Sequence, residues 1–595
     1  MLLKFLTHLK VPTCLNRCPV YKHESMKEQK KSYYRGDFSE PLKLVTIGQT
    51  IEQAAHEHAN EMAILIHGGQ KLTYAQVLEK IDTLAAAFMN LGLKRGDHVA
   101  IWGFNTIEWY LSFLAAFRAG IVVVNLNPLF EAPEVLACLN IGDVKAILMD
   151  EQNNDRNFYD ILKNAIPDIQ EHDCNTHIIT KHAPLLKTVV MFSETAYKGV
   201  FRWKDLFTTV TKEQIKNIRN TQQEIDPFDI CNIQFTSGTT SKPKGVSLRH
   251  HSIVNNARSI GNRLELFKKK ARILCQVPFF HSLGMLAGVF ASIITGSTIV
   301  VPSVKFSPNK SIDSIITDKC TVVHGTPTMY IDLIRVVKNR AQSDPKVYEK
   351  ISSVERFFSA GALILPDTIM QLKTLFKNSK FSCGYGMTEA TGGIFISLPD
   401  DSEEVLHTTV GHTLDHIEVK VVDDNSQLVP FGQPGEMCFR GYMLMKEYYK
   451  EPEKTKAVLS EDGWFHSGDR LALMENGYAQ IVGRIKDIII RGGENIAPSE
   501  IEKVIMNHQD VVDVQVYGVS DARLGEKVAA SIIKTKNSNL SEYDVKQYCE
   551  GKITSYKIPE YVFFCEKYPK TASGKIQKVK LREITEKELQ NRNKY

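Results

Sequence analysis

The feature that most constrains the fold is an alternation of short apolar runs with longer amphipathic stretches, which begins at about residue 47. The apolar runs that have the length of buried strands lie at residues 98–102, 121–125 and 145–149. Before the first of these runs, a helix is expected at 73–91, because Thr73 and Gln76 can form a capping box and Gly92 can end the helix. Strands that alternate with helices are typical of parallel sheets covered by helices, so the sequence predicts an α/β fold.

A change of pattern near residue 480 predicts where the chain divides, since 595 residues are too many for one compact core. Up to that point the alternation continues, except for a polar, weakly periodic segment at 153–224 that we expect to be an irregular surface elaboration. Beyond it, a helix opened by Pro498 and further short apolar runs predict a small α+β unit. We therefore expect a large N-terminal domain of helix-covered sheets at 45–484 and a small C-terminal α+β domain at 485–595.

Composition argues against several classes of protein. Apolar residues at 43% and charged residues at 24% are ordinary for a globular protein. The net charge of +5 is spread over 73 basic and 68 acidic residues without a basic cluster, so no nucleic-acid partner is expected. The apolar stretch 283–304 is interrupted by glycines and Pro302, which favours a buried helix and strand over a transmembrane segment. The eleven cysteines form neither a zinc-binding CxxC pattern nor a disulfide framework.

The N-terminus differs from the rest of the chain in its charge. It carries four basic residues and no acidic residue before Glu24, with apolar residues spaced as on an amphipathic helix. This balance is typical of a mitochondrial transit peptide, which we expect at residues 1–35, with the mitochondrial matrix as the destination. The alternative is a frayed basic terminus on a cytoplasmic protein.

A glycine- and hydroxyl-rich loop follows the strand expected at 230–234. Residues 235–245 read FTSGTTSKPKG. Glycines let backbone amides approach an anion, hydroxyls add donors and lysines compensate charge, so the loop is expected to bind phosphate. It is not a Walker loop, because Pro243 and the order Lys244-Gly245 do not fit that motif. The candidate ATP-binding residues here are Thr236, Ser237, Gly238, Thr239, Thr240, Ser241, Lys242, Lys244 and Gly245.

This loop resembles the phosphate loop of the adenylate-forming superfamily, which includes acyl-CoA synthetases, firefly luciferases and peptide-synthetase adenylation domains. The family usually has glycine where this chain has Ser241, and a side chain there restricts φ. The resemblance implies a carboxylate that attacks the α-phosphate of ATP to form an acyl-adenylate and pyrophosphate. Coenzyme A then takes the acyl group and AMP leaves. ATP and coenzyme A are the expected co-substrates, Mg²⁺ is the expected cofactor and a fatty acid is the expected partner.

Further motifs of the family follow in order and imply roles for single residues. The adenine pocket would include Gly361 and Ala362, and Tyr385 beside Gly386 would stack on adenine. Two residues of the same signature would act on the phosphates, Thr388 at the α-phosphate and Glu389 as the Mg²⁺ ligand. The remaining roles fall on Asp469 and Arg484 at the ribose and on His281 at the acyl carboxylate.

The C-terminal motifs imply a domain that moves. Lys486 resembles the family's hinge, about which the small domain is thought to rotate between the two half-reactions. The loop expected on the coenzyme A side consists of Arg491, Gly492, Gly493 and Glu494. Lys575, in the string SGKIQK, resembles the catalytic lysine, whose cation can reach the carboxylate and the α-phosphate together. The catalytic set implied by the resemblance is Lys575, Thr388, Glu389 and His281.

The substrate is suggested by the strings NIQFTSGTT, HGTPTMY, DIIIRGGENI and SGKIQK, which look most like the subgroup of mitochondrial medium-chain acyl-CoA ligases. A medium-chain fatty acid is therefore the expected substrate. Family analogy suggests a pocket lined by Asn256, Phe280, Tyr330, Ala360 and Gly392. Another carboxylate substrate or acceptor, or a luciferase-like oxygenase, remains an alternative.

Overall fold

The structure is a computed structural model that describes residues 30–38, 40–153, 156–236, 243–361, 364–484, 487, 489–491, 494–521, 524–550, 552–553, 555–571 and 575–592. Most of the expected transit peptide lies outside these residues. Its last part belongs to the fold, because strand β1 (Tyr33–Arg35) pairs antiparallel with β20 (Ile417–Val422).

The first sheet of the described chain has eight strands in the order β10-β9-β6-β4-β5-β11-β12-β22. The strands from β10 to β11 are parallel to one another, and β12 and β22 continue the sheet antiparallel. Their bounds are β4 His98–Trp102, β5 Val122–Leu126, β6 Val144–Asp150, β9 Thr188–Phe192, β10 Phe201–Arg202, β11 Ile230–Thr236, β12 Lys244–Arg249 and β22 Glu447–Tyr448. Associated helices are α1 Ile47–Glu57, α2 Tyr74–Asn90, α3 Ile107–Arg118, α4 Ala132–Ile141, α5 Phe158–Ala165 and α6 Lys212–Asn220. The expected alternation of strands and helices is confirmed.

The second sheet has nine strands within the described residues, in the order β19-β18-β17-β16-β15-β13-β14-β2-β3, with parallel pairing from β17 to β2. The strand bounds are β2 Met62–Ile66, β3 Lys71–Thr73, β13 Arg272–Cys275, β14 Thr298–Val301, β15 Val322–Gly325, β16 Arg356–Ala360, β17 Lys380–Tyr385, β18 Phe395–Ile396 and β19 His412–Thr413. Helices of this half are α7 His250–Arg263, α8 Ala291–Thr295, α9 Pro308–Asp318, α10 Pro327–Ser343, α11 Val347–Lys350, α12 Pro366–Leu375 and α13 Glu403–Thr408. Apolar side chains of β13, β15 and β16 pack with α9, α10 and α12 in a common core.

The third sheet corrects the expectation that alternation continues to residue 480. Its order is β1-β20-β21-β23-β24, every pairing is antiparallel, and the added strands are β21 Gly435–Gly441, β23 Phe465–Leu473 and β24 Ala479–Arg484. The helix described between β21 and β23, α14 (Pro452–Lys456), has five residues and buries none of them. Val419 and Val421 alternate with half-buried Glu418 and Lys420, the period-two pattern of a sheet with one covered face.

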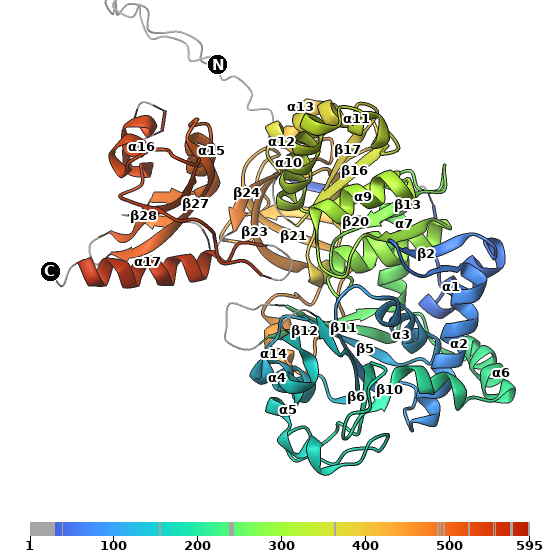
Figure 1. Cartoon of the computed structure of the whole chain (residues 1–595). Helices are drawn as coiled ribbons and strands as arrows, with labels where there is room; N and C mark the ends of the chain where they lie inside the picture. Colours follow the sequence, from blue (N-terminus) through green and yellow to red (C-terminus); the bar gives the residue numbers. More distant parts are fainter. Residues whose placement is uncertain are drawn as a thin grey trace, which may run out of the picture.

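The C-terminal unit has the predicted α+β composition. Strands β25 (Ile489–Arg491), β26 (Glu494–Ile496), β27 (Val511–Asp521), β28 (Gly525–Lys534) and β29 (Tyr561–Phe564) form one sheet. The helices are α15 Pro498–Met506, α16 Glu542–Cys549 and α17 Lys578–Arg592. Figure 1 shows this unit, in orange and red, as a separate body beside β23 and β24. Ser499 connects the two, since its hydroxyl donates to the carbonyl oxygen of Val482 at 2.9 Å.

The segment 153–224 is not the irregular elaboration that we expected. It contributes β9, which pairs in parallel register with β6, and the helices α5 and α6. The strand Thr188–Phe192 is short and lies among polar residues, so its buried pattern is diluted in any longer window of sequence.

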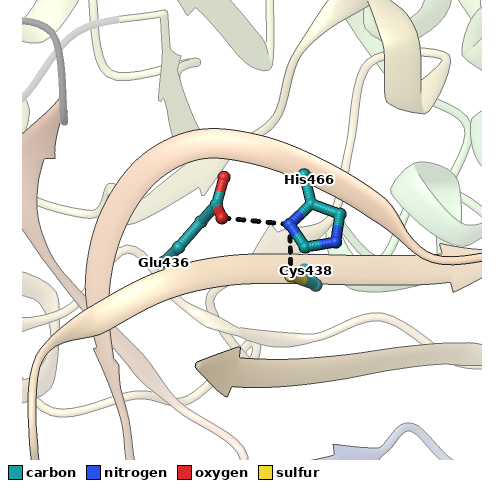
Figure 2. Close-up of side chains that lie close together, drawn as sticks. All are labelled: Glu436, Cys438 and His466. Carbon is teal, nitrogen blue, oxygen red and sulfur yellow. Dashed lines mark hydrogen bonds and ion pairs between the residues drawn. The ribbon is translucent and has the colours of Figure 1, made fainter. Parts of the chain in front are cut away.

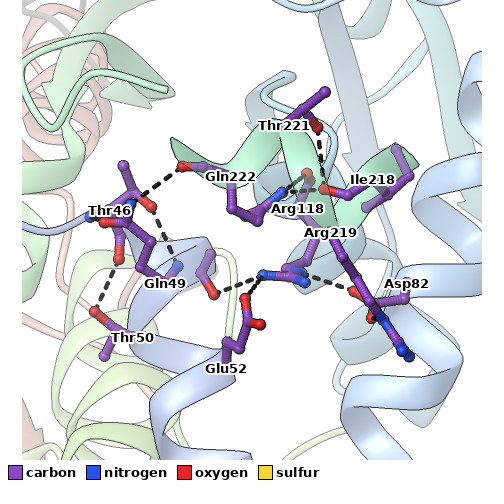
Figure 3. A network of polar contacts seen from close by, with 11 residues as sticks. Thr46, Gln49, Thr50, Glu52, Asp82, Arg118, Ile218, Arg219, Thr221 and Gln222 are labelled. Atoms are coloured by element: carbon purple, nitrogen blue, oxygen red, sulfur yellow. Dashed lines mark hydrogen bonds and ion pairs between the residues drawn. The ribbon is translucent and has the colours of Figure 1, made fainter. Parts of the chain in front are cut away.

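A buried ionic network attaches the end of this segment to the helix layer (Figure 3). The guanidinium of Arg118, on α3, is fully buried and donates to Asp82 and Glu52, at 2.8 Å in each case. Arg219 donates to the second oxygen of Asp82 at 2.7 Å, and the amide of Gln222 donates to the carbonyl of Arg118 at 2.6 Å. Removing one partner of such a buried pair typically costs about 3 to 5 kcal/mol, so this network fixes how α1, α2, α3 and α6 pack.

The apolar stretch 283–304 forms a buried π-helix, η4 (Gly284–Phe290), which continues into α8 and is followed by the buried strand β14. The prediction of a buried helix and strand is confirmed, whereas the π-helical geometry was not anticipated. Of the helices described, none is long and apolar enough to cross a membrane.

Candidate active site

A cavity lies at the carboxyl ends of the parallel strands β16 and β17. Ligands of open α/β sheets commonly bind at this edge. Several parts of the chain contribute to its wall, namely α7, the start of η4, the ends of β16 and β17, the loop after β17, β18 and the C-terminal unit. The lining residues include His281, Leu283, Leu286, Ala287, Ala360, Gly361, Tyr385, Gly386, Thr388, Gly392, Phe395, Ile396 and Lys575.

The loop after β17 is folded tightly back on itself, and Gly386 makes this possible. A Cβ atom at this position would lie 1.4 Å from the carbonyl oxygen of Gly392, so no other residue fits. The fold-back places Thr388 at the start of a short 3-10 helix, η5 (Thr388–Ala390), with its side chain on the cavity wall. The amides of Gly392 and Ile394 donate to backbone carbonyls of the same loop and hold it closed.

Glu389 is buried next to Thr388 and is held by a tyrosine that the sequence did not reveal. Its Oε1 atom accepts a hydrogen bond from the Tyr448 hydroxyl at 2.8 Å. Burial, and then the negative charge of Glu389, raises the pKa of Tyr448, so the phenol remains a proton donor. The ammonium of Lys244 lies 4.7 Å above the Tyr448 ring. Tyr448 therefore connects Glu389 with the strand that follows the phosphate loop.

The two residues expected at the ribose are cross-strand neighbours. Asp469 on β23 is paired in register with Arg484 on β24. The carboxylate of Asp469 is buried and accepts a hydrogen bond from the hydroxyl of Tyr385, the residue expected at the adenine. The structure thus brings the expected adenine and ribose residues into contact.

His281 faces the cavity and is enclosed by protein on its other sides. Burial, with a smaller effect from the nearby Lys575 cation, lowers the pKa of His281 to about 3. The imidazole is therefore neutral at physiological pH. Its Nδ1 atom accepts a hydrogen bond from the amide of Leu283 at 3.2 Å, which leaves the proton on Nε2.

Lys575 comes from the C-terminal unit and lines the same cavity as His281 and Thr388. Its Cε atom would lie 3.6 Å from a Cβ atom on Gly361, whose φ of +88° suits glycine. The backbone amide of Lys575 donates to the hydroxyl of Thr571 at 3.1 Å. The C-terminal unit therefore delivers a cation to a cavity that the large domain forms.

Other expected site residues are distributed as follows. Thr236, Lys244 and Gly245 lie on β11 and β12, on either side of the phosphate loop, and do not line the cavity. Arg491 lies 3.8 Å from Glu560, also in the C-terminal unit, and is not part of the cavity wall. The expected residues that lie outside the described part of the chain are Ser237, Gly238, Thr239, Thr240, Ser241, Lys242, Ala362, Lys486, Gly492 and Gly493. Only the backbone is described for Arg484 and Glu494.

The apolar end of the cavity corrects part of the expected substrate pocket. Ala360 and Gly392 line it as expected, and the Asn256 amide holds its wall by donating to the Gly393 carbonyl at 2.9 Å. Phe280 is not among the lining residues. Tyr330 is fully buried on α10 and donates to the carbonyl oxygens of Val323 and Phe358, so it packs beneath the sheet.

The apolar side chains that sequence reasoning missed come mainly from η4 and β18, namely Leu283, Leu286, Ala287, Phe395 and Ile396. The apolar run itself signalled that these residues are buried. Which of them face a cavity depends on the π-helical turn and on the contact between η4 and the loop after β17.

Comparison with known proteins places this geometry in a family. The profile of the AMP-binding enzyme family matches residues 51–449, and that of the AMP-binding enzyme C-terminal domain matches residues 500–575. The chain belongs to this family of AMP-binding enzymes. Its similarity within the family is to acyl-CoA synthetases, as the relatives show.

Several relatives carry the description "Medium-chain acyl-CoA ligase ACSF2, mitochondrial", among them proteins of Danio rerio and Homo sapiens. The protein of Danio rerio is 36% identical over 561 residues, which cover 94% of this chain and 91% of the relative. The protein of Homo sapiens is 34% identical over 563 residues, which cover 94% and 90%.

Solved structures of AMP-binding enzymes share the fold. ATP-bound MatB from Rhodopseudomonas palustris has a TM-score of 0.77 at 24% identity, with 91% of this chain and 99% of that chain covered. The anthranilate CoA ligase AuaEII in complex with anthranoyl-AMP has a TM-score of 0.78 at 24% identity, with coverage of 92% and 98%. The α/β fold with a large sheet-and-helix domain and a small C-terminal domain is therefore that of the adenylate-forming enzymes.

Proposed function

We propose that this protein ligates a medium-chain fatty acid to coenzyme A through an acyl-adenylate, with release of pyrophosphate and AMP. The observation that carries the proposal is the position of Lys575, which reaches from the C-terminal unit into a cavity that also contains His281 and Thr388 and has an apolar end. A cation and a neutral hydrogen-bond donor suit a carboxylate, and the apolar end suits an alkyl chain.

In the first half-reaction, a carboxylate oxygen attacks the α-phosphorus of ATP, and the bond to pyrophosphate breaks. Lys575 would stabilise the negative charge shared by the carboxylate and the α-phosphate. Thr388 would donate its hydroxyl to the α-phosphate. His281 would orient the carboxylate by donating its Nε2 proton in a hydrogen bond, which its neutral state permits.

In the second half-reaction, the sulfur of coenzyme A attacks the acyl carbonyl, and the bond to AMP breaks. The thiol proton leaves with AMP or solvent. No protein side chain needs to act as a nucleophile. Burial raises the pKa of the Cys231 and Cys275 thiols, and this also argues against a covalent route through either of them.

Nucleotide binding would use residues on both sides of the cavity. Tyr385 would stack on adenine, Asp469 would accept hydrogen bonds from the ribose hydroxyls, and the loop between β11 and β12 would bind the phosphates. Glu389 fits the Mg²⁺ that the family implies, because it presents a hard carboxylate whose orientation Tyr448 fixes. Bound Mg²⁺ would neutralise phosphate charge next to Thr388.

A chain-length series tests the substrate. Purified protein is assayed for AMP release with acetate, octanoate or palmitate, together with ATP, Mg²⁺ and coenzyme A. We expect kcat/KM to be highest for octanoate, because the apolar wall from Ala287 to Phe395 rewards methylenes until the cavity is full. Equal values for acetate and octanoate would contradict a fatty-acid pocket, and ADP as the product would contradict adenylate formation.

The proposed location is the mitochondrial matrix, which the basic N-terminus and the relatives named mitochondrial support. Because β1 and the bridge between Lys31 and Pro430 belong to the fold, the targeting signal would lie before Lys30. Residues 1–29 fused to a fluorescent reporter should therefore enter mitochondria. A diffuse cytosolic reporter would reject the targeting role.

A further inference from the structure

Three side chains of metal-binding type converge on the third sheet, outside the cavity (Figure 2). Glu436 and Cys438 lie two residues apart on β21 and therefore project from the same side of the strand. His466, on β23, is the direct cross-strand partner of Cys438. Figure 2 shows the His466 ring nitrogen facing both the carboxylate and the sulfur.

The distances approach those of a metal site. The Nδ1 atom of His466 lies 3.4 Å from the sulfur of Cys438 and 3.0 Å from Oε2 of Glu436. All three ligand atoms lie within 4.8 Å of one another. Zinc bonds of about 2.0 to 2.3 Å in a tetrahedron separate neighbouring ligand atoms by roughly 3.3 to 3.7 Å. Small side-chain rotations would therefore admit the ion.

The three candidate ligands combine a buried side chain with two partly exposed ones, so that the site is fixed on one side and open to an ion on the other. Cys438 is fully buried, which fixes the sulfur, whereas the side chains of His466 and Glu436 are 32% and 24% exposed. An ion can enter from the exposed side, and water can complete the tetrahedron there. Binding would transfer the thiol proton to solvent and leave a thiolate on the metal. The alternative is a simple ion pair between Glu436 and His466. Such a pair does not explain why the Cys438 sulfur lies next to the same nitrogen of His466.

The cluster also holds the backbone that presents Asp469. The second oxygen of Glu436, Oε1, accepts a hydrogen bond from the amide of Gly468 at 3.0 Å. Gly468 has a φ of +70° and lies in an irregular part of β23 where the register with β21 shifts. Asp469 follows it directly, and its amide donates to the Ser467 hydroxyl at 3.1 Å. The Glu436 and His466 ligand atoms are only 3.0 Å apart, so a metal between them would displace the Glu436 carboxylate and disturb this support.

We propose that Glu436, Cys438 and His466 bind Zn²⁺, and that the bound ion weakens ATP binding at the neighbouring Asp469. The second part rests on the proposed function, whereas the first does not. The site would make nucleotide binding sensitive to free zinc.

Cobalt spectroscopy tests the metal site without nucleotide or substrate. Metal-free full-length protein is titrated with Co²⁺, which replaces zinc and reports thiolate ligation by a near-ultraviolet charge-transfer band. We expect a band that saturates at one Co²⁺ per chain and disappears when Zn²⁺ is added. The band should be lost in Cys438→Ser and, independently, in His466→Gln. It should persist in Cys174→Ser, which alters an exposed cysteine elsewhere. Absence of the band, or its persistence in both site variants, would overturn the proposal.

The effect on nucleotide is measured separately as the Kd of ATP with and without Zn²⁺. If displacement of Asp469 removes one hydrogen bond between its carboxylate and the ATP ribose, the Kd of ATP should become about tenfold weaker. We expect this change in the unaltered protein and a much smaller one in His466→Gln, which controls for zinc bound to ATP itself. A cobalt band together with an unchanged Kd of ATP would retain the metal site and refute its coupling to Asp469. Failure of the ligase assay with a positive cobalt titration would refute the proposed function instead.

Discussion

Replacing Lys575 with alanine should abolish the first half-reaction selectively. Lys575 is a cation on the cavity wall, and its charge acts on His281, the residue proposed to hold the carboxylate. Loss of one preorganised charge contact to the transition state typically costs about 10² to 10³ in rate, or about 3 to 4 kcal/mol. Because the side chain is exposed, Lys575→Ala should leave the thermal unfolding midpoint unchanged.

Two assays separate the half-reactions. Fatty-acid-dependent exchange between ATP and labelled pyrophosphate reports adenylation, and thioester formation from supplied acyl-adenylate reports the second step. Lys570→Ala is the matched control, because Lys570 is an exposed lysine of the same segment. We expect exchange to fall by about 10² or more in Lys575→Ala, with thioester formation and the control nearly unchanged.

The reverse pattern is expected at the proposed hinge. Proline at Lys486 would fix φ, so Lys486→Pro should spare exchange and block thioester formation if the C-terminal unit must rotate between steps. An equal slowing of both half-reactions in Lys575→Ala would refute the assignment of this lysine to adenylation alone.

Three further predictions concern the metal, the acyl pocket and pH. Glu389→Gln keeps the size of the side chain but removes its charge. We therefore expect kcat to fall about 10²-fold with little change in fatty-acid affinity. Normal turnover at saturating Mg²⁺ would exclude a metal-binding role for Glu389. Ala287→Leu adds three carbons to the cavity wall, which should displace about three methylenes of a long acyl chain. At about 0.8 kcal/mol for each methylene, kcat/KM for decanoate should fall roughly fiftyfold, whereas kcat/KM for butyrate should not change. An equal loss for both acids would argue against a position of Ala287 on the wall. Burial lowers the pKa of His324 from 6.5 to about 3. The unfolded chain therefore binds a proton that the folded chain does not, and about 2 kcal/mol of stability should be lost between about pH 7 and pH 5. In His324→Phe the unfolding midpoint should depend less on pH over this range, and an unchanged dependence would contradict the buried neutral state.

Local signals predicted much of the fold. The helix Tyr74–Asn90 has the expected capping box at Thr73, and the strand at 98–102 has its expected bounds, because cap chemistry and the length of an apolar run act within a few residues. The strand Thr188–Phe192 and the third sheet were missed, since both depend on pairing between residues far apart in the sequence. Capping signals carry no information about such pairing.

The residues of the candidate site were also predicted only in part. Family motifs gave the order of the site residues, and the structure brings His281, Thr388 and Lys575 to one cavity. The hydrogen bond from Tyr448 to Glu389 could not be predicted, because it depends on the pairing of β22 with β12. Tyr330 was assigned to the pocket by analogy, and only the packing of α10 on the sheet shows that it points elsewhere.

The central claim is that a carboxylate attacks the α-phosphorus of ATP in this cavity. It is tested most directly by a single turnover with octanoate labelled with oxygen-18 in both carboxylate oxygens, in the presence of ATP, Mg²⁺ and coenzyme A. Mass spectrometry of the nucleotide product should then find AMP with one oxygen-18 atom and unlabelled pyrophosphate. AMP without the label, or ADP as the product, would contradict the account.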